Sequence, residues 1–307
     1  MKTHILITGS AGLIGRAVRA SLEQSGVKVI GLDLKSIGQE FGDVRNPLTI
    51  QRAFEGCIGI IHLAAISRVI WGEQDPDNCW KTNVDGLANV LNLAQMQPSK
   101  PWLIFASSRE VYGQPDVLPA TENAPLNPVN IYGRAKVEGE RLVNLARQQG
   151  LRTAIIRLSN VYGSTADHHD RVVPAFARAA VLGQTLRVDG SNHTFDFTHL
   201  DDTVRGIIAL VKYLDEGHDT VSPIHFLTGQ PTTLGQLAAM ANDASKSGSE
   251  VIQSPPRNFD VSQFYGNPQR AKELLDWVPR ITIKDGISRL IEDFRTELMP
   301  ELALESI

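Results

Sequence analysis

The sequence predicts an α/β fold in which a doubly wound parallel sheet carries helices on both faces. Three observations indicate it: short, nearly unbroken apolar segments, longer amphipathic segments that alternate with them, and a glycine-rich turn directly after the first apolar segment. Parallel strands are buried on both faces, so they read as continuous apolar runs. A chain of 307 residues can form one large domain and a smaller one.

The first half of the chain supplies most of the expected sheet. Its predicted strands are residues 4–8, 28–33, 59–64, 102–107 and 153–158. Its predicted helices are residues 13–24, 47–55, 77–96 and 131–149. Pro47 suits the first turn of the second helix, and Asp75 precedes the third as a capping residue. Strands and helices in strict alternation predict parallel crossovers.

After about residue 160 the alternation becomes less regular. A polar loop at 163–171 is followed by predicted helices at 174–182, 201–214, 234–245, 268–275 and 283–298, by predicted strands at 185–188 and 224–228, and by a proline-rich break at 254–258. We therefore expect residues 1–160 to form the main sheet domain. Residues 161–307 are expected to form mainly a smaller, substrate-binding domain that is partly interwoven with the sheet.

Composition excludes several classes of partner. With 42% hydrophobic and 21% charged residues and a net charge of −4, the chain resembles an ordinary globular protein. It contains no basic patch interleaved with aromatic residues and no apolar run of the ~20 residues that span a bilayer, so neither nucleic acid nor membrane is expected. Cys57 and Cys79 lack metal or redox spacing. Unpaired thiols and a start without a leader predict a cytoplasmic protein.

A glycine-rich loop, Gly9-Ser-Ala-Gly12-Leu-Ile-Gly15, joins the first predicted strand to the first helix. In such a loop one glycine allows the tight turn, one lets a pyrophosphate approach the backbone, and one lets helix and strand pack closely. The free N–H groups of the helix then hold the phosphates. Asp33, at the end of the second predicted strand, can accept hydrogen bonds from the adenosine ribose, which favours NAD over NADP.

Tyr132 and Lys136 lie four residues apart on a predicted helix, so their side chains share a face. A cation beside the phenol stabilises the phenolate, and the pKa of Tyr132 is expected to fall from about 10 toward the working pH. Such a tyrosine can take a proton from an alcohol while a hydride leaves for a nicotinamide. Behind the glycine loop, this pair predicts a nicotinamide-dependent alcohol–ketone centre.

These residues resemble the extended short-chain dehydrogenase/reductases, in particular the NAD-dependent epimerase/dehydratase family, over nearly the whole chain. Further matching segments are "GDVRN" with Asp43 and Val44, "HLAA" at 62–65, "TNVDG" with Asn83, "FASSREVYG" with Ser108, "RLSNVYG" with Asn160, and "PPRNFDVSQFYG" with Arg257. The resemblance implies a Rossmann-type fold, bound NAD, and a homodimer formed through helices 77–96 and 131–149.

The resemblance also implies roles for individual residues. Tyr132 would be the general acid/base, Lys136 would lower its pKa and hold the nicotinamide ribose, and Ser108 would bind the substrate oxygen. The implied NAD-binding residues are Gly9, Gly12, Leu13, Ile14, Gly15, Asp33, Asp43, Val44, Leu63, Ala64, Ala65, Asn83, Tyr132 and Lys136. The implied substrate-binding residues are Ser108, Asn160, Arg171 and Arg257.

Two departures from the family pattern bear on the reaction. Dehydratases carry Asp-Glu after the catalytic residue, whereas this chain has Arg109-Glu110, and arginine cannot donate a proton near neutral pH. Dehydration is therefore disfavoured, and Glu110 is either a catalytic base or a supporting residue. Phe195 stands where the family has an arginine that binds the substrate diphosphate. The uronate decarboxylases of the family use that arginine, so decarboxylation is also disfavoured.

The substitution at position 195 leaves two possibilities for the substrate. Either Arg257, Arg187 or Arg171 carries the phosphate charge, or the substrate lacks the usual diphosphate. The leading hypothesis is an NAD-dependent nucleotide-sugar epimerase. The alternatives are a dehydrogenase, reductase or dehydratase acting on a sugar or another small carbonyl substrate, and a non-catalytic NAD-sensing regulator. The His168-His169-Asp170 run lies in a polar loop and predicts no metal site.

Overall fold

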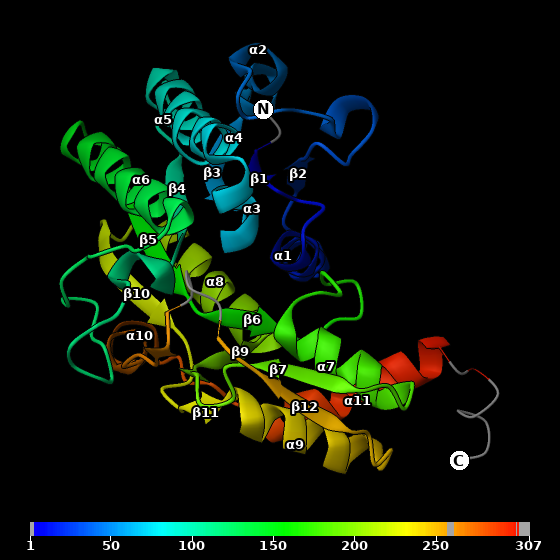
Figure 1. Cartoon of the computed structure of the whole chain (residues 1–307). Coiled ribbons are helices and arrows are strands. Elements are labelled where there is room, and N and C mark those ends of the chain that lie inside the picture. Colours follow the sequence, from blue (N-terminus) through cyan, green and yellow to red (C-terminus); the bar gives the residue numbers. More distant parts are fainter. Residues whose placement is uncertain (1–2, 257–260, 299, 301–307) are drawn as a thin grey trace.

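The computed structural model describes residues 3–256, 261–298 and 300. Its centre is a six-stranded sheet in the order β2-β1-β3-β4-β5-β10, and every neighbouring pair is parallel. The strands are β1 His4–Thr8, β2 Val29–Leu32, β3 Cys57–His62, β4 Trp102–Ser108, β5 Thr153–Leu158 and β10 Val221–Phe226. The predicted doubly wound α/β fold is confirmed, and Figure 1 shows the sheet between its two layers of helices.

Alternating residues of the sheet serve two separate cores. Ile5 and Ile7 of β1 face α1 (Leu13–Gln24) and α8 (Leu200–Asp215), and Leu6 between them faces the opposite side. There α5 (Gly86–Met96) and α6 (Ile131–Gln148) cover the sheet. The side chains of a strand alternate between its faces, so an apolar strand can feed both cores. This explains why the strands read as unbroken apolar segments.

A third core belongs mostly to the second half of the chain. Helices α7 (Val172–Val181), α9 (Leu234–Ser245) and α11 (Ile283–Leu298) pack together there. Short strand pairs lie beside them: β6 Asn160–Tyr162 with β9 Phe197–His199, β7 Leu186–Asp189 with β12 Val251–Ser254, and β8 Thr194–Phe195 between β11 Thr232–Thr233 and β13 Gln263–Phe264. The second half also returns to the main sheet, because β10 is its edge strand beside β5 and α8 covers one of its faces, with α10 (Gln269–Leu275) packed against both.

Most predicted elements form with bounds within a few residues of the expectation, but two predicted helices differ. The expected helix at 77–96 consists of α4 (Pro76–Trp80), a π-helical segment (Lys81–Asp85) and α5. The expected helix at 47–55 is α2 (Pro47–Ile50) followed by a 3₁₀ segment. Helix α3 (Val69–Gln74) and most short strands were not predicted, because segments of two to six residues are too short to show a periodic apolar pattern.

Among the described residues, no helix has both the length and the apolar character that crossing a membrane requires. Cys57 and Cys79 are both buried and unpaired.

A buried ion pair ties α6 to the sheet. Arg157 of β5 contacts Glu140 of α6 through Nη2 and Oε2 at 2.6 Å, and both side chains are 4% exposed. Ser107 donates to the other oxygen of Glu140 at 2.6 Å. Arg157 also donates to Tyr112 and to the carbonyl oxygen of Glu122. Every strong donor in this cluster therefore meets an acceptor, as a buried pair requires.

Replacing Arg157 with Met should lower the free energy of unfolding by about 3–5 kcal/mol, because Glu140 would be left buried without its partner. The double variant Arg157→Met/Glu140→Leu removes both charges and should recover most of that loss. Urea denaturation monitored by circular dichroism measures both values. Equal stabilities for the wild type and the Arg157→Met variant would contradict this account of the pair.

Candidate functional site

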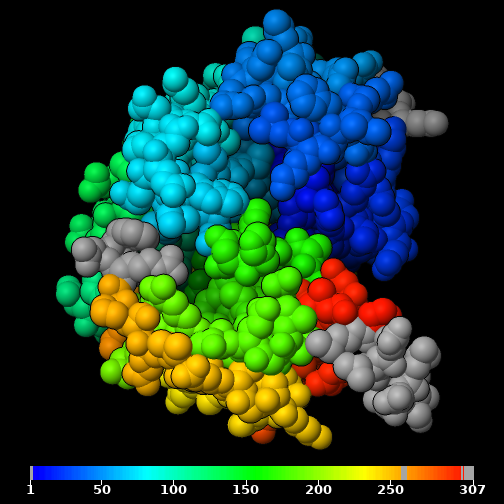
Figure 2. Space-filling model, turned by 45° about the vertical axis from the view of Figure 1, so that its right-hand side comes forward, coloured from blue at the N-terminus to red at the C-terminus, as the bar shows by residue number. Residues whose placement is uncertain are grey.

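A large cleft opens at the carboxyl ends of the parallel strands. It has a volume of about 1020 Å³ and is lined by the loops that follow β1, β3, β4 and β5 and by residues of α7, β7 and β8. Figure 2 shows this face hollowed between the N-terminal part, in blue and cyan, and the later part, in green to yellow. Ligands of open α/β sheets bind at this edge of the sheet. The glycine loop and the Tyr132–Lys136 pair both line the same cleft.

The glycine loop is closed so tightly that side chains cannot replace its first and last glycines. Gly9 has a φ of +73°, and a Cβ added there would lie 2.7 Å from the backbone nitrogen of Ala64. A Cβ on Gly15 would lie 2.2 Å from the carbonyl oxygen of Gly9. Gly12 precedes α1 and provides no capping side chain, so the first N–H groups of this helix remain available for an anion.

Asp33 is held beside this loop by backbone hydrogen bonds. The N–H of Ala11 donates to one carboxylate oxygen at 3.0 Å, and the N–H of Lys35 donates to the other at 2.8 Å. Each oxygen keeps a lone pair that can accept a hydrogen bond from a ligand hydroxyl. Asp33 lines the cleft, as the expected ribose contact requires.

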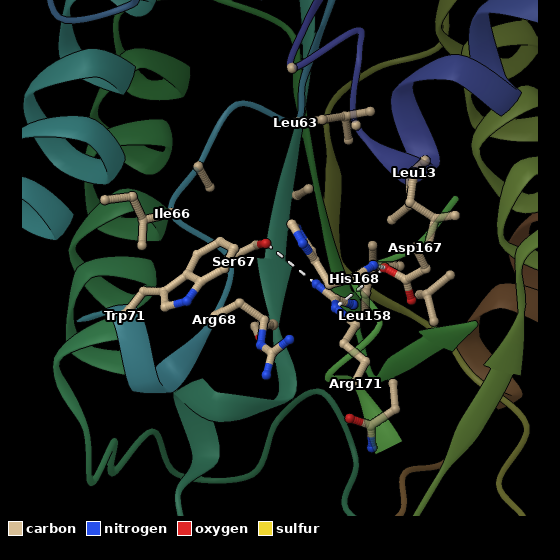
Figure 3. Close-up of a pocket in the computed structure, with 18 of the residues that line it drawn as sticks. Leu13, Leu63, Ile66, Ser67, Arg68, Trp71, Leu158, Asp167, His168 and Arg171 are labelled. Atoms are coloured by element: carbon tan, nitrogen blue, oxygen red, sulfur yellow. Dashed lines mark hydrogen bonds and ion pairs between the residues drawn. The ribbon is translucent and has the colours of Figure 1, made fainter. Parts of the chain in front are cut away.

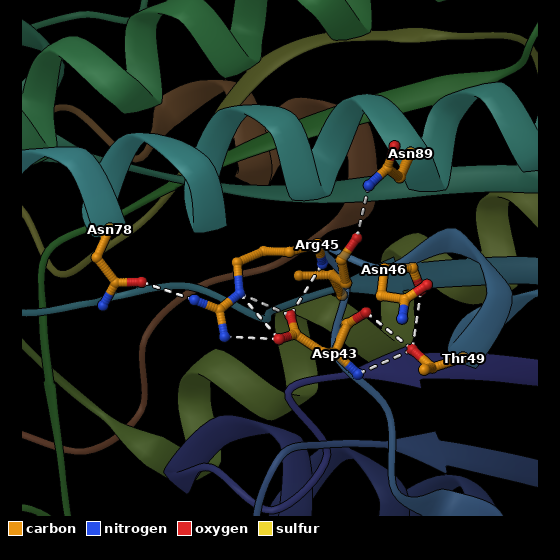
Figure 4. Close-up of polar contacts among 7 residues, drawn as sticks. Asp43, Arg45, Asn46, Thr49, Asn78 and Asn89 are labelled. Carbon is orange, nitrogen blue, oxygen red and sulfur yellow. Dashed lines mark hydrogen bonds and ion pairs between the residues drawn. The ribbon is translucent and has the colours of Figure 1, made fainter.

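The carboxylate of Asp43 is paired with Arg45, a residue for which the sequence analysis predicted no role. Figure 4 shows Arg45 between Asp43 and Asn78: its Nη2 lies 2.6 Å from Oδ2 of Asp43, and its Nη1 donates to Asn78 at 2.8 Å. Hydrogen bonding to Arg45 lowers the pKa of Asp43. Asn89 donates to the carbonyl oxygen of Val44 at 3.0 Å. Asp43, Val44 and Arg45 all line the cleft.

Asn83 supports the cleft wall from behind. Its side chain accepts from the N–H of Ile66 at 2.8 Å and donates to the carbonyl oxygen of Ile66 at 3.0 Å. Asn83 is 2% exposed and does not line the cleft, whereas Leu63, Ala64 and Ala65 do. The amide of Asn83 therefore fixes the segment after β3.

Ser108, Tyr132 and Lys136 meet where β4 ends and α6 begins. Asn130 caps α6 by accepting from the N–H of Gly133 at 2.7 Å, which sets the direction of the first turn. The Nζ of Lys136 donates to the carbonyl oxygen of Ala106 at 2.7 Å and lies 5.7 Å from the centre of the Tyr132 ring. All three residues of the cluster are less than a tenth exposed.

Burial sets the acidity of both titratable groups. It raises the pKa of Tyr132 to about 12, against a smaller lowering by the adjacent Ser108 hydroxyl. It lowers the pKa of Lys136 to about 8. The expected fall in the pKa of Tyr132 is therefore wrong for the protein alone. Desolvation of the phenolate outweighs the lowering that was expected from Lys136.

Glu110 is buried between two neighbours. Its Oε1 lies 2.8 Å from Nη2 of Arg109, and its Oε2 accepts from Asn130 at 2.8 Å. Through Asn130, the carboxylate is linked to the cap of the helix that carries Tyr132. With both oxygens engaged, Glu110 is better placed to support the site than to accept a proton from a substrate.

The segments on the two sides of the cleft touch each other. In Figure 3, Arg171 and Ser67 are joined across the cleft at 3.3 Å. Arg68 pairs with Asp170, and the ring of Trp71 meets the ring of His168 edge-on at 4.9 Å. The loop at 163–171 thus packs against the segment that runs from β3 into α3.

The expected substrate residues divide between the cleft and its surroundings. Arg171 and Asn160 line the cleft, and Asn160 also donates to the carbonyl oxygen of Asp196 at 3.3 Å. Arg187 lines it too, but its side chain is 72% exposed and is paired with Asp189. Arg257 lies outside the described residues.

Comparison with known proteins identifies the family. A model of the NAD dependent epimerase/dehydratase family matches residues 5–222. The chain belongs to this family. A putative UDP-glucose 4-epimerase from Methanocaldococcus jannaschii is 30% identical, over 94% of this chain and 97% of its own. UDP-glucuronic acid decarboxylase 6 from Arabidopsis thaliana is 31% identical, over 96% and 90%.

A solved structure agrees with the family assignment. UDP-glucose 4-epimerase from Thermotoga maritima, crystallised with UDP-glucose, superposes with a TM-score of 0.89 at 27% identity, over 96% of this chain and all of its own. The protein is thus an NAD-dependent enzyme of the short-chain dehydrogenase/reductase type.

The cleft fits the family's cofactor. The close approach around Gly9 and Gly15, the free N–H groups of α1 and the carboxylate of Asp33 are the groups that hold a dinucleotide's pyrophosphate and ribose. When bound, NAD supplies a hydride acceptor or donor.

Replacing Gly15 with Ala should weaken NAD binding by at least about tenfold, equivalent to ~1.4 kcal/mol, because the new Cβ would displace the carbonyl of Gly9. Quenching of the protein's fluorescence by NAD measures the affinity. The control variant, Ala20→Gly, lies on the exposed side of the same helix and should leave the affinity unchanged. Equal affinities for Gly15→Ala and wild type would contradict the assigned role of this loop.

Proposed function

We propose that the protein is an NAD-dependent nucleotide-sugar epimerase. The observation that carries the proposal is the cluster of Ser108, Tyr132 and Lys136, which lines one cleft together with a dinucleotide-binding glycine loop. The related proteins named as epimerases support it. A transiently oxidised sugar would turn within the cleft before hydride returns to its other face.

In this proposal Tyr132 exchanges the proton of the sugar hydroxyl. Ser108 holds the same oxygen, and its own position is fixed because it accepts from the N–H of Glu110 at 3.2 Å. Lys136, anchored to the carbonyl oxygen of Ala106, brings a positive charge close to the phenol. Since burial favours the neutral phenol, Tyr132 would need the positive charge of Lys136 beside it to release its proton. Proton transfer and hydride transfer are then coupled.

A second candidate is a net dehydrogenase or reductase acting on a sugar. It is favoured by Phe195, which fills a cleft position where the related family pattern has a diphosphate-binding arginine. The two candidates differ in redox balance. An epimerase returns its hydride, so the NADH absorbance stays constant, whereas a dehydrogenase accumulates NADH in proportion to product.

Replacing Tyr132 with Phe should lower kcat by about 10²–10⁴-fold, because the general acid/base is removed. NAD affinity should stay within twofold of the wild type. Product formation from a panel of nucleotide sugars, followed by NMR, gives the rate. A Tyr132→Phe variant that retains full turnover would contradict the mechanism, and a wild type that acts on no nucleotide sugar would contradict the proposed function.

We also propose that the protein forms a homodimer through α5 and α6. Met96 at the end of α5 is 77% exposed, and Leu145 on α6 is 40% exposed. Val137 and Leu142, by contrast, pack against the protein's own cores. Exposed apolar groups on adjacent helices suit an interface with a second copy.

Light scattering after size exclusion should therefore give twice the chain mass of 33.6 kDa. The variant Leu145→Glu should shift the protein to monomer, because it places a charge in the apolar contact. The variant Arg134→Glu, at an exposed position on the same helix, tests whether any charge change there has this effect. A monomeric wild type would contradict the proposed dimer.

A further inference from the structure

Arg109 occupies a distinctive place in the cleft. It begins the 3₁₀ turn that follows β4, directly after Ser108, and it lines the cleft beside that residue. Its side chain is only 12% exposed. A guanidinium keeps its charge at any pH at which the protein is folded, so this site places a permanent cation next to the reacting groups.

Three neighbours fix the guanidinium. Its Nη2 pairs with Glu110 at 2.8 Å. Its central carbon lies 4.6 Å from the centre of the Phe195 ring and 5.9 Å from that of Phe264. Aromatic faces attract a cation and hold its plane. Only one oxygen of Glu110 contacts Arg109, because the other accepts from Asn130. The carboxylate therefore does not engage both amino groups of the arginine.

The remaining amino group of Arg109 lacks an acceptor. Its Nη1 is buried and has no hydrogen-bond partner among the residues that the structure describes. A buried donor left unpaired costs roughly 1–3 kcal/mol. A ligand oxygen that enters the cleft beside Phe195 would remove this cost, and an anionic oxygen would gain a charge-assisted hydrogen bond as well.

The other described arginines at this end of the cleft are less suited to the task. Arg171 also has a buried Nε without a hydrogen-bond partner, but its side chain is 28% exposed, its Nε faces Asp167 at 3.5 Å and its Nη2 donates to Ser67 at 3.3 Å. The side chain of Arg187 is 72% exposed and paired with Asp189, so water screens its charge. Arg109 combines enclosure, a fixed orientation and a free donor.

We propose that Arg109 is the anion-binding residue of the substrate half of the cleft, and that its ligand is an oxyanion of the nucleotide sugar. Two oxyanions offer the same chemistry to a guanidinium: an oxygen of the diphosphate and a carboxylate on the sugar ring. The inference rests on the proposed function, since it assumes that a nucleotide sugar enters this cleft. Phe195 then serves as the platform that orients the arginine.

The test is a titration of NAD-loaded wild type and Arg109→Met with UDP-glucose, UDP-glucuronate, UDP and uridine, measured by isothermal calorimetry. Loss of one charge-assisted hydrogen bond should weaken binding by about 10- to 100-fold. If the diphosphate is the ligand, UDP and both sugars lose affinity together and uridine does not. If a sugar carboxylate is the ligand, UDP-glucuronate alone loses affinity.

Three further variants separate charge recognition from folding. Arg109→Lys keeps a cation beside Glu110 but lacks the second amino group, so it should lose affinity for the same ligands. Adding Phe195→Arg to Arg109→Met should restore affinity, because the new guanidinium starts from a neighbouring position. Arg141→Met removes an arginine that also pairs with a glutamate, on the exposed side of α6, and should change nothing.

Two results would overturn the inference. If wild type binds UDP-glucose or UDP-glucuronate and both Arg109 variants bind every ligand within twofold of it, Arg109 is not the anion-binding residue and the proposed function stands. If the wild type binds none of the nucleotide ligands, the proposed function fails and the inference falls with it. NAD affinity and melting temperature, measured on each variant, show that the cleft is still folded.

Discussion

Helix α6 is docked on strand β4 by buried polar contacts, and the side chains of Tyr132 and Lys136 take their positions from that docking. Lys136 reaches back to the carbonyl oxygen of Ala106, and Glu140 accepts from Ser107. At the start of the helix, Asn130 joins its cap to Glu110. These contacts leave little freedom for the phenol of Tyr132 relative to Ser108. Such rigidity is valuable because proton and hydride transfer both depend on alignment.

The enclosure that fixes these groups also shifts their acidity. Removing water disfavours the phenolate of Tyr132 and the ammonium of Lys136, so the pKa of the tyrosine rises, the pKa of the lysine falls, and the two values move apart. The side chain of Tyr132 is thereby kept protonated near neutral pH. The buried contacts of the protein therefore fix the geometry of the site and keep the phenol of Tyr132 neutral.

The sequence predicted what depends on local pattern. The glycine loop, Asp33 and the Tyr132–Lys136 pair lie within single strand–loop–helix units, where spacing alone determines which side chains come together. The contact between Arg109 and Phe195 joins the turn after β4 to β8, and no periodic pattern links such distant segments. The expected fall in the pKa of Tyr132 was wrong, because the burial that raises this pKa depends on the complete fold. Asn83 was expected at the cofactor, yet its amide supports the backbone of Ile66 from behind.

The most direct test of this account is the ionisation of Tyr132 itself, followed by the NMR signal of its ring Cζ in protein labelled with ¹³C-tyrosine. Tyr132→Phe assigns the signal. Because burial raises the pKa of Tyr132 to about 12, we predict that its signal stays in the protonated position from pH 7 to about pH 11, the range in which exposed tyrosines titrate near 10. Titration of Tyr132 below pH 10 in the protein alone would contradict the account.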